Sequence, residues 1–117
     1  MDDKNVSEVR PLDAMKVASD NHEVFLENDY IRVLDARVAA GERTPVHTHQ
    51  WPGVLYVMGW SDFIRFDADA NILFDSHTMS TLEPGASLWS DALPPHYVHN
   101  IDGKELRVIT IELKQAV

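Results

Sequence analysis

Cysteine is absent from this 117-residue sequence, and basic residues are few. The absence of cysteine excludes disulfide bonds, thiolate metal ligands and a cysteine nucleophile. Only 10 lysines and arginines stand against 19 acidic residues, which gives a net charge of −9. We therefore expect no binding to nucleic acid or to anionic membranes. No apolar run approaches the length of a transmembrane helix, so no membrane-spanning segment is expected either.

The remaining composition is that of a globular protein. Hydrophobic residues make up 44% of the chain and charged residues 25%, which is close to the globular average. A length of 117 residues suffices for one domain with its own core. Residues 1–5 are polar and lead into no apolar stretch, so we expect no signal peptide and a cytoplasmic location.

The pattern of apolar and turn residues predicts an all-β fold. Residues 1–20 form a polar N-terminal arm, and residues 21–117 form one β-domain in which short strands alternate with turns. No segment after residue 20 has a helical period. The expected strands are 22–27, 30–39, 44–49, 54–58, 62–67, 72–75, 78–82, 87–90, 97–101 and 105–113.

Two local patterns refine this prediction. The run 54–58 is continuously apolar, which is typical of a strand buried on both faces. Asp102-Gly103 is a strong β-hairpin signal, which predicts that the strands on its two sides pair. So many strands require paired or closed sheet edges, and an antiparallel β-barrel provides them most completely.

The strongest functional signal is the pair His47 and His49. Side chains at positions i and i+2 of a strand point to the same face, and His96 from another part of the sheet can complete a three-nitrogen site. Neutral imidazole is a common ligand of zinc, iron, nickel and copper, and three such ligands leave coordination positions for a substrate. We therefore predict one divalent metal ion per chain, held by His47, His49 and His96.

The sequence around these histidines resembles the two motifs of the cupin superfamily of small β-barrels. The matching positions are Gly41, His47 and His49 in the first motif and Gly85, His96 and Asn100 in the second. The Pro and Gly positions of the second motif hold Asp91 and Leu93 instead. The resemblance implies a jelly roll, or double-stranded β-helix, with the metal in its mouth. It also implies that Asn100 supports the site structurally and that the protein is a homodimer.

One position departs from the family pattern. The glutamate of the first cupin motif, a fourth metal ligand, should fall at Gly53 or Val54, and neither side chain can bind a metal. Three neutral imidazoles leave the full positive charge on the metal, so we expect its ligand to be a small chelating organic anion or carbonyl compound. Gln50 and Asp91 are alternative fourth ligands, and Glu112 could supply the missing carboxylate from the last strand.

Other residues are secondary candidates. Tyr56 and Glu112 are candidate catalytic groups, because a hydroxyl or a carboxylate can move or orient a proton. An arginine on a strand can hold a substrate carboxylate through two hydrogen bonds. The candidate substrate-binding residues are Trp51, Arg32, Arg37 and Arg65. His22 has no partner in the sequence pattern, and we expect it to be an ordinary exposed residue.

Three functions fit this reading of the sequence. The first is a dioxygenase-like enzyme that acts on a small oxygenated organic acid or a diketone, with iron as the expected metal. The second is an isomerase or lyase with zinc, nickel or manganese as a Lewis acid. The third is a module that binds a small ligand without turnover. Proton transfer needs a positioned acid or base, and the sequence offers no unambiguous one, which favours the first and third functions.

Overall fold

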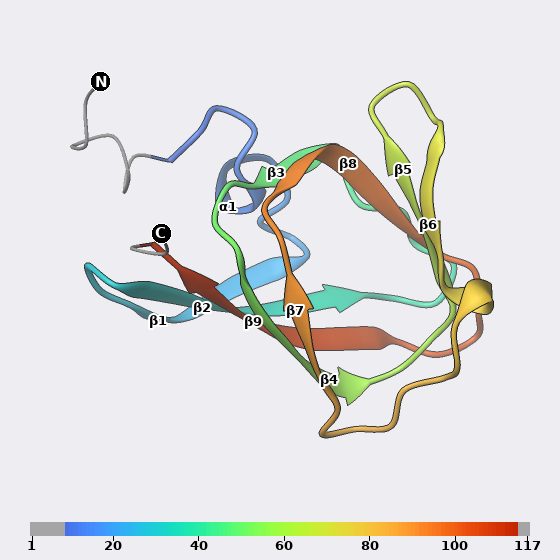
Figure 1. The fold of residues 1–117 in the computed structure, drawn as a ribbon. Coiled ribbons are helices and arrows are strands. Elements are labelled where there is room, and N and C mark those ends of the chain that lie inside the picture. Colours follow the sequence, from blue (N-terminus) through green and yellow to red (C-terminus); the bar gives the residue numbers. More distant parts are fainter. Residues whose placement is uncertain (1–8, 115–117) are drawn as a thin grey trace.

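Nine strands of the described residues build two antiparallel β-sheets that face each other (Figure 1). The structure is a computed structural model that describes residues 9–114. One sheet has the order β1-β2-β9-β4-β7, and the other has the order β3-β8-β5-β6. The strands are β1 (His22–Glu27), β2 (Ile31–Val38), β3 (His47–His49), β4 (Gly53–Gly59), β5 (Phe63–Asp67), β6 (Ile72–Asp75), β7 (Ser87–Ser90), β8 (Leu93–Asn100) and β9 (Leu106–Leu113). The predicted all-β jelly-roll class is confirmed.

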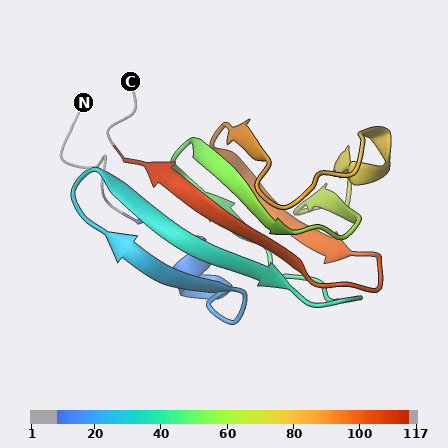
Figure 2. The same ribbon diagram turned by 90° about the horizontal axis from the view of Figure 1, so that it is seen from below.

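The five-stranded sheet shows which side chains face the interior. In β2, Arg32, Leu34 and Val38 are buried, as expected for alternate residues on one face of a strand. β9 pairs along the whole of β2, and Figure 2 shows these two strands lying next to each other in one layer. The inner face of this sheet therefore carries a buried arginine among its apolar residues.

The apolar core lies at one end of the sandwich. Val38 ends β2, Leu106 begins β9 opposite it, and Phe63 begins β5 in the other sheet. Partly buried apolar side chains pack around these three residues: Trp60, Phe74, Val98 and Val108. This cluster joins the two sheets at one end and leaves the inner face at the other end to polar residues.

Two predictions about β-strands are wrong. The run 54–58 is not buried on both faces, because Tyr56 and Met58 are each 40% exposed on the outer side of β4. The segment 78–82 is not a strand: a short 3-10 helix, Ser76–Thr78, is followed by irregular backbone. In the first case the outer face of a two-layer sandwich meets solvent, so even an apolar strand has one accessible side.

The hairpin predicted at Asp102-Gly103 is also wrong. The turn connects β8 to β9, but these strands belong to different sheets and do not pair with each other. β8 pairs with β3 and β5, and β9 pairs with β2 and β4. Turn residues therefore predicted the change of chain direction correctly, while long-range pairing decided the partners.

Residues 9–21 cover the strand that carries the paired histidines. The short helix α1 (Ala14–Val17) begins after Asp13, whose carboxylate accepts a hydrogen bond from the backbone N–H of Met15. The backbone N–H of Thr48 in β3 donates to the carbonyl of Leu12 at 2.8 Å. Asp13, Ala14 and Ala18 are buried, so this part of the chain packs into the domain.

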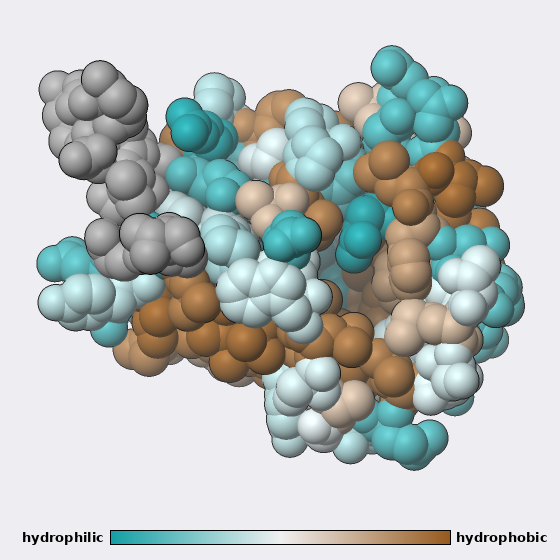
Figure 3. All heavy atoms as spheres, in the orientation of Figure 1, coloured by the Kyte–Doolittle hydropathy of each residue, from teal (hydrophilic) through white to brown (hydrophobic). Residues whose placement is uncertain are grey.

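Apolar side chains are exposed on the edge strand β1 and the turn after it. Phe25 is 51% exposed, Leu26 52% and Tyr30 68%. Figure 3 shows apolar side chains gathered at the lower left of the face that is drawn there. An exposed apolar edge strand is a surface that a second chain can pair with, and the homodimer stays a prediction.

Within residues 9–114, no helix is both long enough and apolar enough to span a membrane.

The start of β4 leaves no room for a side chain. Gly53 pairs with Glu112 of β9, and a Cβ atom at Gly53 would collide with the carbonyl oxygen of Ile111 and lie 2.8 Å from its carbonyl carbon.

We therefore expect Gly53→Ala to lower the free energy of unfolding by about 2 kcal/mol or more, because the backbone of a central strand must move. Urea unfolding would measure the change. Gly103→Ala is the matched control, since nothing lies within 4 Å of its Cβ position. Equal stability of the two variants would contradict this packing.

Candidate metal centre

Four histidines converge at the end of the sandwich opposite the apolar core. His22 begins β1, His47 and His49 lie on β3, and His96 lies on β8 directly opposite His47. One ring nitrogen from each of His22, His47 and His49 lies within 4.8 Å of the other two. The ring of His96 is centred 4.4 Å from that of His47 and 5.8 Å from that of His49. The three histidines predicted from the sequence are therefore brought together, with a fourth beside them.

The expectation that His22 is an ordinary exposed residue is wrong. Its side chain is buried, with 7% of its surface exposed, and its ring is centred 5.1 Å from that of His47. His22 reaches the site because β1 pairs with β2 at the edge of the five-stranded sheet, with His22 opposite Ala36. No motif spacing marks this residue, since its position depends on the pairing of β1 and on the turn that precedes it.

The second ring nitrogen of each histidine is already occupied. The Nδ1 atoms of His22, His47 and His96 lie 3.0, 2.8 and 2.7 Å from the backbone carbonyl oxygens of Ala18, Pro45 and Pro94. The Nδ1 atom of His49 lies 2.9 Å from Oε2 of Glu112. Each of these oxygens accepts a hydrogen bond, so each Nδ1 must carry the proton.

This arrangement fixes the form of all four rings. A neutral imidazole protonated at Nδ1 has its lone pair on Nε2, which is the atom a metal binds. Metal-binding histidines in proteins usually donate their other N–H to a carbonyl or a carboxylate in this way. The nitrogens of His22, His47 and His49, which lie within 4.8 Å of one another, therefore fit a divalent metal ion without any change of tautomer, and His96 lies beside them.

Burial keeps three of the imidazoles neutral. Desolvation lowers the pKa of His22 to about 4, that of His47 to about 3 and that of His96 to about 2. The neighbouring imidazoles act in the same direction, because a second positive charge close by disfavours protonation. A metal ion would therefore meet little competition from protons at these rings near neutral pH.

Glu112 stands next to the position where the cupin glutamate was expected. It pairs across the sheet with Gly53, and it lies buried with its carboxylate between two donors. Its Oε2 accepts from His49, and its Oε1 accepts from Nε of Arg32 at 2.6 Å. Burial alone would raise the pKa of Glu112, but the hydrogen bonds from His49 and Arg32 outweigh it and lower the pKa. The carboxylate thus stays ionised and acts on the site through His49.

Arg32 continues this chain of contacts to the N-terminal segment. Its Nη1 and Nη2 atoms donate to the two carboxylate oxygens of Asp13 at 2.9 and 2.8 Å. Arg32 is 2% exposed and Asp13 is fully buried, so the pair is shielded from water. All three nitrogens of the guanidinium donate to carboxylates of the protein, and Arg32 does not line the cavity beside the histidines, so the structure does not place it to hold a substrate carboxylate.

The other sequence candidates are distributed around the site. Arg65 and Trp51 line a cavity of about 360 Å³ that opens between the sheets beside the histidines. Arg37 lies on the outer face, bound to Asp35, and Tyr56 lies outside the cavity. The structure therefore brings Arg65 and Trp51 to the histidines and does not bring Arg37 or Tyr56.

Gln50 and Asp91 make other contacts. Gln50 accepts a hydrogen bond from the backbone N–H of Arg10 at 2.7 Å, and Asp91 accepts one from the indole of Trp89 at 2.9 Å. Neither residue is grouped with the paired histidines His47 and His49. The additional side chain that lies with them is that of His22.

Asn100 is fully buried at the end of β8. Its side-chain amide donates to the carbonyl oxygens of Val38 and Lys104 at 2.9 and 2.7 Å, and its oxygen accepts from the backbone of Asp102. It therefore fixes the turn that carries the chain from one sheet to the other, at the opposite end of β8 from the proline-rich segment before His96.

Comparison with known structures supports the fold. A cupin domain from Bordetella pertussis is similar at 22% identity with a TM-score of 0.63, over 79% of this chain and 90% of that one. An RmlC-like cupin from Methanocaldococcus jannaschii aligns at 12% identity with a TM-score of 0.55, over 79% and 77%. The polyketide cyclase RemF from Streptomyces resistomycificus aligns at 17% identity with a TM-score of 0.52, over 80% and 64%.

Sequence comparisons add nothing to this, since no family model and no curated protein matches the chain significantly.

The depressed pKa values predict how stability depends on pH. Between pH 6.5 and about 4.5 the unfolded chain binds protons at His22, His47 and His96, whereas the folded chain does not. The metal-free protein should therefore lose stability as the pH falls through this range, by about 1.4 kcal/mol per pH unit for each histidine. Urea unfolding in the presence of a chelator would measure the slope.

The exposed His77 supplies the control for this measurement, and His77→Asn should keep the slope of the parent protein. The carboxylates with lowered pKa values, Asp13, Asp35, Asp67 and Glu112, add to the loss only as the pH approaches their ordinary pKa values of 3.8 and 4.5. The slope between pH 6.5 and about 5.5 therefore reports the histidines. Stability that stays constant from pH 6.5 to 4.5 would show that the three histidines are not buried in the neutral form.

Glu112→Gln tests the contact that orients His49. The amide keeps the shape of the side chain but removes the charge that both His49 and Arg32 contact, so metal affinity should fall by about 10- to 100-fold. Competition with a chromogenic chelator would measure the affinity. Glu105→Gln, at an exposed position beside β9, is the control. An unchanged metal affinity in Glu112→Gln would show that Glu112 does not contribute to metal binding.

Proposed function

We propose that this protein binds one divalent metal ion through His22, His47, His49 and His96. We further propose that it acts as a dioxygenase-like enzyme on a small organic acid or diketone. The observation that carries the proposal is the set of four buried imidazoles, each with its Nδ1 proton engaged and its Nε2 lone pair available. The cupin fold places this set beside a cavity of about 360 Å³, the size of a small-molecule site.

The number of imidazoles favours some metals over others. Four nitrogen ligands complete the tetrahedral coordination that zinc prefers, and no position would be left for a substrate. An ion that accepts six ligands, such as iron, nickel or manganese, keeps two positions for a bidentate ligand or for two reactants. Iron is the metal that supports chemistry with dioxygen, and this is the chemistry we propose for it here.

The residues of the chain itself bind and orient the substrate. Among the described residues that line the cavity, Glu112 is the only carboxylate, and no tyrosine or lysine is present. Both oxygens of Glu112 accept hydrogen bonds from Arg32 and His49, so it is not free to take a proton from a substrate. The remaining candidate bases are the imidazoles. Once their Nε2 lone pairs are bound to a metal, the site lacks a ready general base, which argues against an isomerase and in favour of chemistry supplied by the metal.

A second candidate is a non-oxidative reaction on a carbonyl compound. The similarity in fold to the polyketide cyclase RemF is the observation that favours it. There a redox-inert metal would act as a Lewis acid, and the chain would contribute the shape of the cavity. A non-catalytic ligand-binding role would need the same residues and no turnover.

Elemental analysis of protein purified without chelators tests the metal site. We expect about one metal ion per chain in the parent protein and a loss of most of it in both His22→Ala and His96→Ala. His77→Ala removes an exposed histidine and should keep the metal. Retention of stoichiometric metal in His22→Ala would reduce the site to three histidines, and absence of metal from the parent protein would refute the proposal.

The identity of the metal and oxygen consumption separate the candidate functions. Iron together with oxygen uptake on addition of a 1,3-diketone or a 2-oxo acid supports the dioxygenase-like reaction. Nickel, manganese or zinc with no oxygen uptake would point to the non-oxidative reaction or to binding alone.

A further inference from the structure

Four cations among the described residues have a carboxylate partner. Arg32 is bound by Asp13 and Glu112, and Arg107 lies 2.9 Å from Asp35. The remaining pairs are Arg37 with Asp35 at 2.9 Å and Lys114 with Glu27 at 2.7 Å. Arg32 and Lys114, the two of these that are buried, follow the rule that a buried positive charge is paired.

Arg65 does not follow this rule. It lies on β5, it lines the cavity, and its Nε atom is buried without a hydrogen-bond partner among residues 9–114. Burial lowers the pKa of Arg65, and no acidic group contributes a shift in the other direction. Its guanidinium instead lies over the ring of Phe74, with Cζ 5.7 Å from the ring centre.

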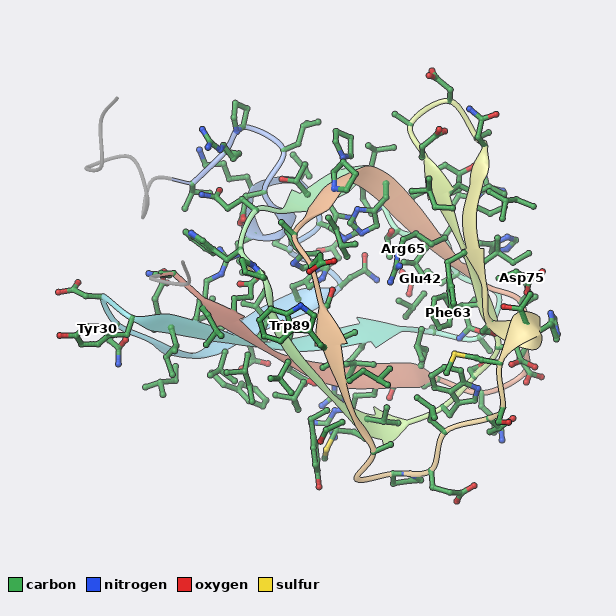
Figure 4. The ribbon with its side chains drawn as sticks, in the orientation of Figure 1. Tyr30, Glu42, Phe63, Arg65, Asp75 and Trp89 are labelled. Atoms are coloured by element: carbon green, nitrogen blue, oxygen red, sulfur yellow. The ribbon has the colours of Figure 1, made fainter. Side chains whose placement is uncertain are left out.

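The register of the sheet places Arg65 on the same wall of the cavity as a metal-site histidine. Arg65 pairs with Val98 of β8, and Val98 lies two residues after His96, on the same face of the strand. The charge of Arg65 contributes to the lowered pKa of His96, which shows that the two groups are close enough to interact. Figure 4 shows Arg65 extending from β5 into the space between the sheets, with Phe63 near it.

The rest of the cavity wall is mainly apolar. Aromatic and aliphatic side chains of both sheets form it, among them Val57, Phe63, Phe74, Leu88 and Val108. A ligand that enters this space meets one unpaired guanidinium on an apolar surface, with the imidazole cluster at the end of the cavity. A carboxylate is the group that matches the planar guanidinium, through two parallel hydrogen bonds.

We propose that Arg65 binds the carboxylate of a small organic acid whose apolar body fills the cavity. The substrate class is then an aryl- or alkyl-substituted monocarboxylic acid that carries its oxygenated group at the imidazole cluster, and this last point rests on the proposed metal function. A neutral diketone would leave the guanidinium unpaired, and a ligand with several charges would bury them against apolar walls. The volume of about 360 Å³ limits the ligand to roughly one ring and a short chain.

Binding of a simple acid to metal-free protein tests this proposal separately from the metal function. The probes are 3-phenylpropanoate and its neutral isostere 3-phenylpropanamide, titrated by calorimetry in the presence of a chelator. We expect the acid to bind at least tenfold more tightly than the amide. Arg65→Gln should abolish that preference, and Arg65→Lys should retain part of it, because lysine keeps the charge but not the planar pair of donors.

Arg37→Gln is the matched control. It removes an arginine from the outer face of the neighbouring sheet, where Asp35 keeps its second partner Arg107, and it should leave the preference for the acid unchanged. Absence of binding by 3-phenylpropanoate, equal binding of acid and amide, or full binding by Arg65→Gln would each overturn the proposal. A protein that binds the acid through Arg65 but retains no metal would refute only the proposed metal function.

Thermal unfolding gives a second, independent measurement. A guanidinium that has no carboxylate or hydrogen-bond partner in an apolar cavity destabilises the ligand-free protein, so Arg65→Met should raise the midpoint of thermal unfolding. Addition of 3-phenylpropanoate should then raise the midpoint of the parent protein and leave that of Arg65→Met unchanged. A lower midpoint in ligand-free Arg65→Met would show that the guanidinium serves the fold, and the proposal would fail.

Discussion

The buried charge of Arg32 is the constraint on which the histidine site depends. An arginine that is 2% exposed needs partners, and each of its three guanidinium nitrogens donates to Asp13 or Glu112. Glu112, held in this way, has its second oxygen directed at His49. The N-terminal segment, β2 and β9 therefore determine together how a histidine on β3 is oriented, although none of these elements contains a sequence motif.

The same network would give a metal ion bound at the histidines a different net charge from one held by a glutamate ligand. A coordinated carboxylate would neutralise part of the metal charge directly, whereas Glu112 acts through the imidazole of His49 and shares its charge with Arg32. The replacement follows from packing, since Gly53 has no space for a side chain and the carboxylate is on the residue opposite it. A metal ion held by neutral imidazoles would, together with the nearby Arg65, make one end of the cavity positive in an otherwise acidic protein.

The sequence was sufficient to predict the fold class and the proximity of the histidines of the two motifs, because strand periodicity and local spacing determine both. It was insufficient for His22 and for the partners of the turn at Asp102-Gly103. Those depend on which strands pair, and pairing is decided by contacts far apart in the chain. In the sequence, Arg32 and Arg65 look alike, since each is an arginine on a predicted strand. Only the structure separates them: Arg32 is paired with a carboxylate, and Nε of Arg65 has no hydrogen-bond partner among the described residues.

The short segment that runs over β3 has Asp13 near one end and His22 just after the other. Asp13 balances the charge of Arg32, and His22 belongs to the histidine cluster. The length of the chain between these two residues therefore determines the positions of both side chains. Two proteins with identical histidine motifs can therefore differ in ligand number and in metal preference through a single inserted or deleted residue upstream of those motifs. Proteins of this fold that bind different metals should therefore be compared in the segment before the first motif. A comparison of the motifs alone would find no difference between them.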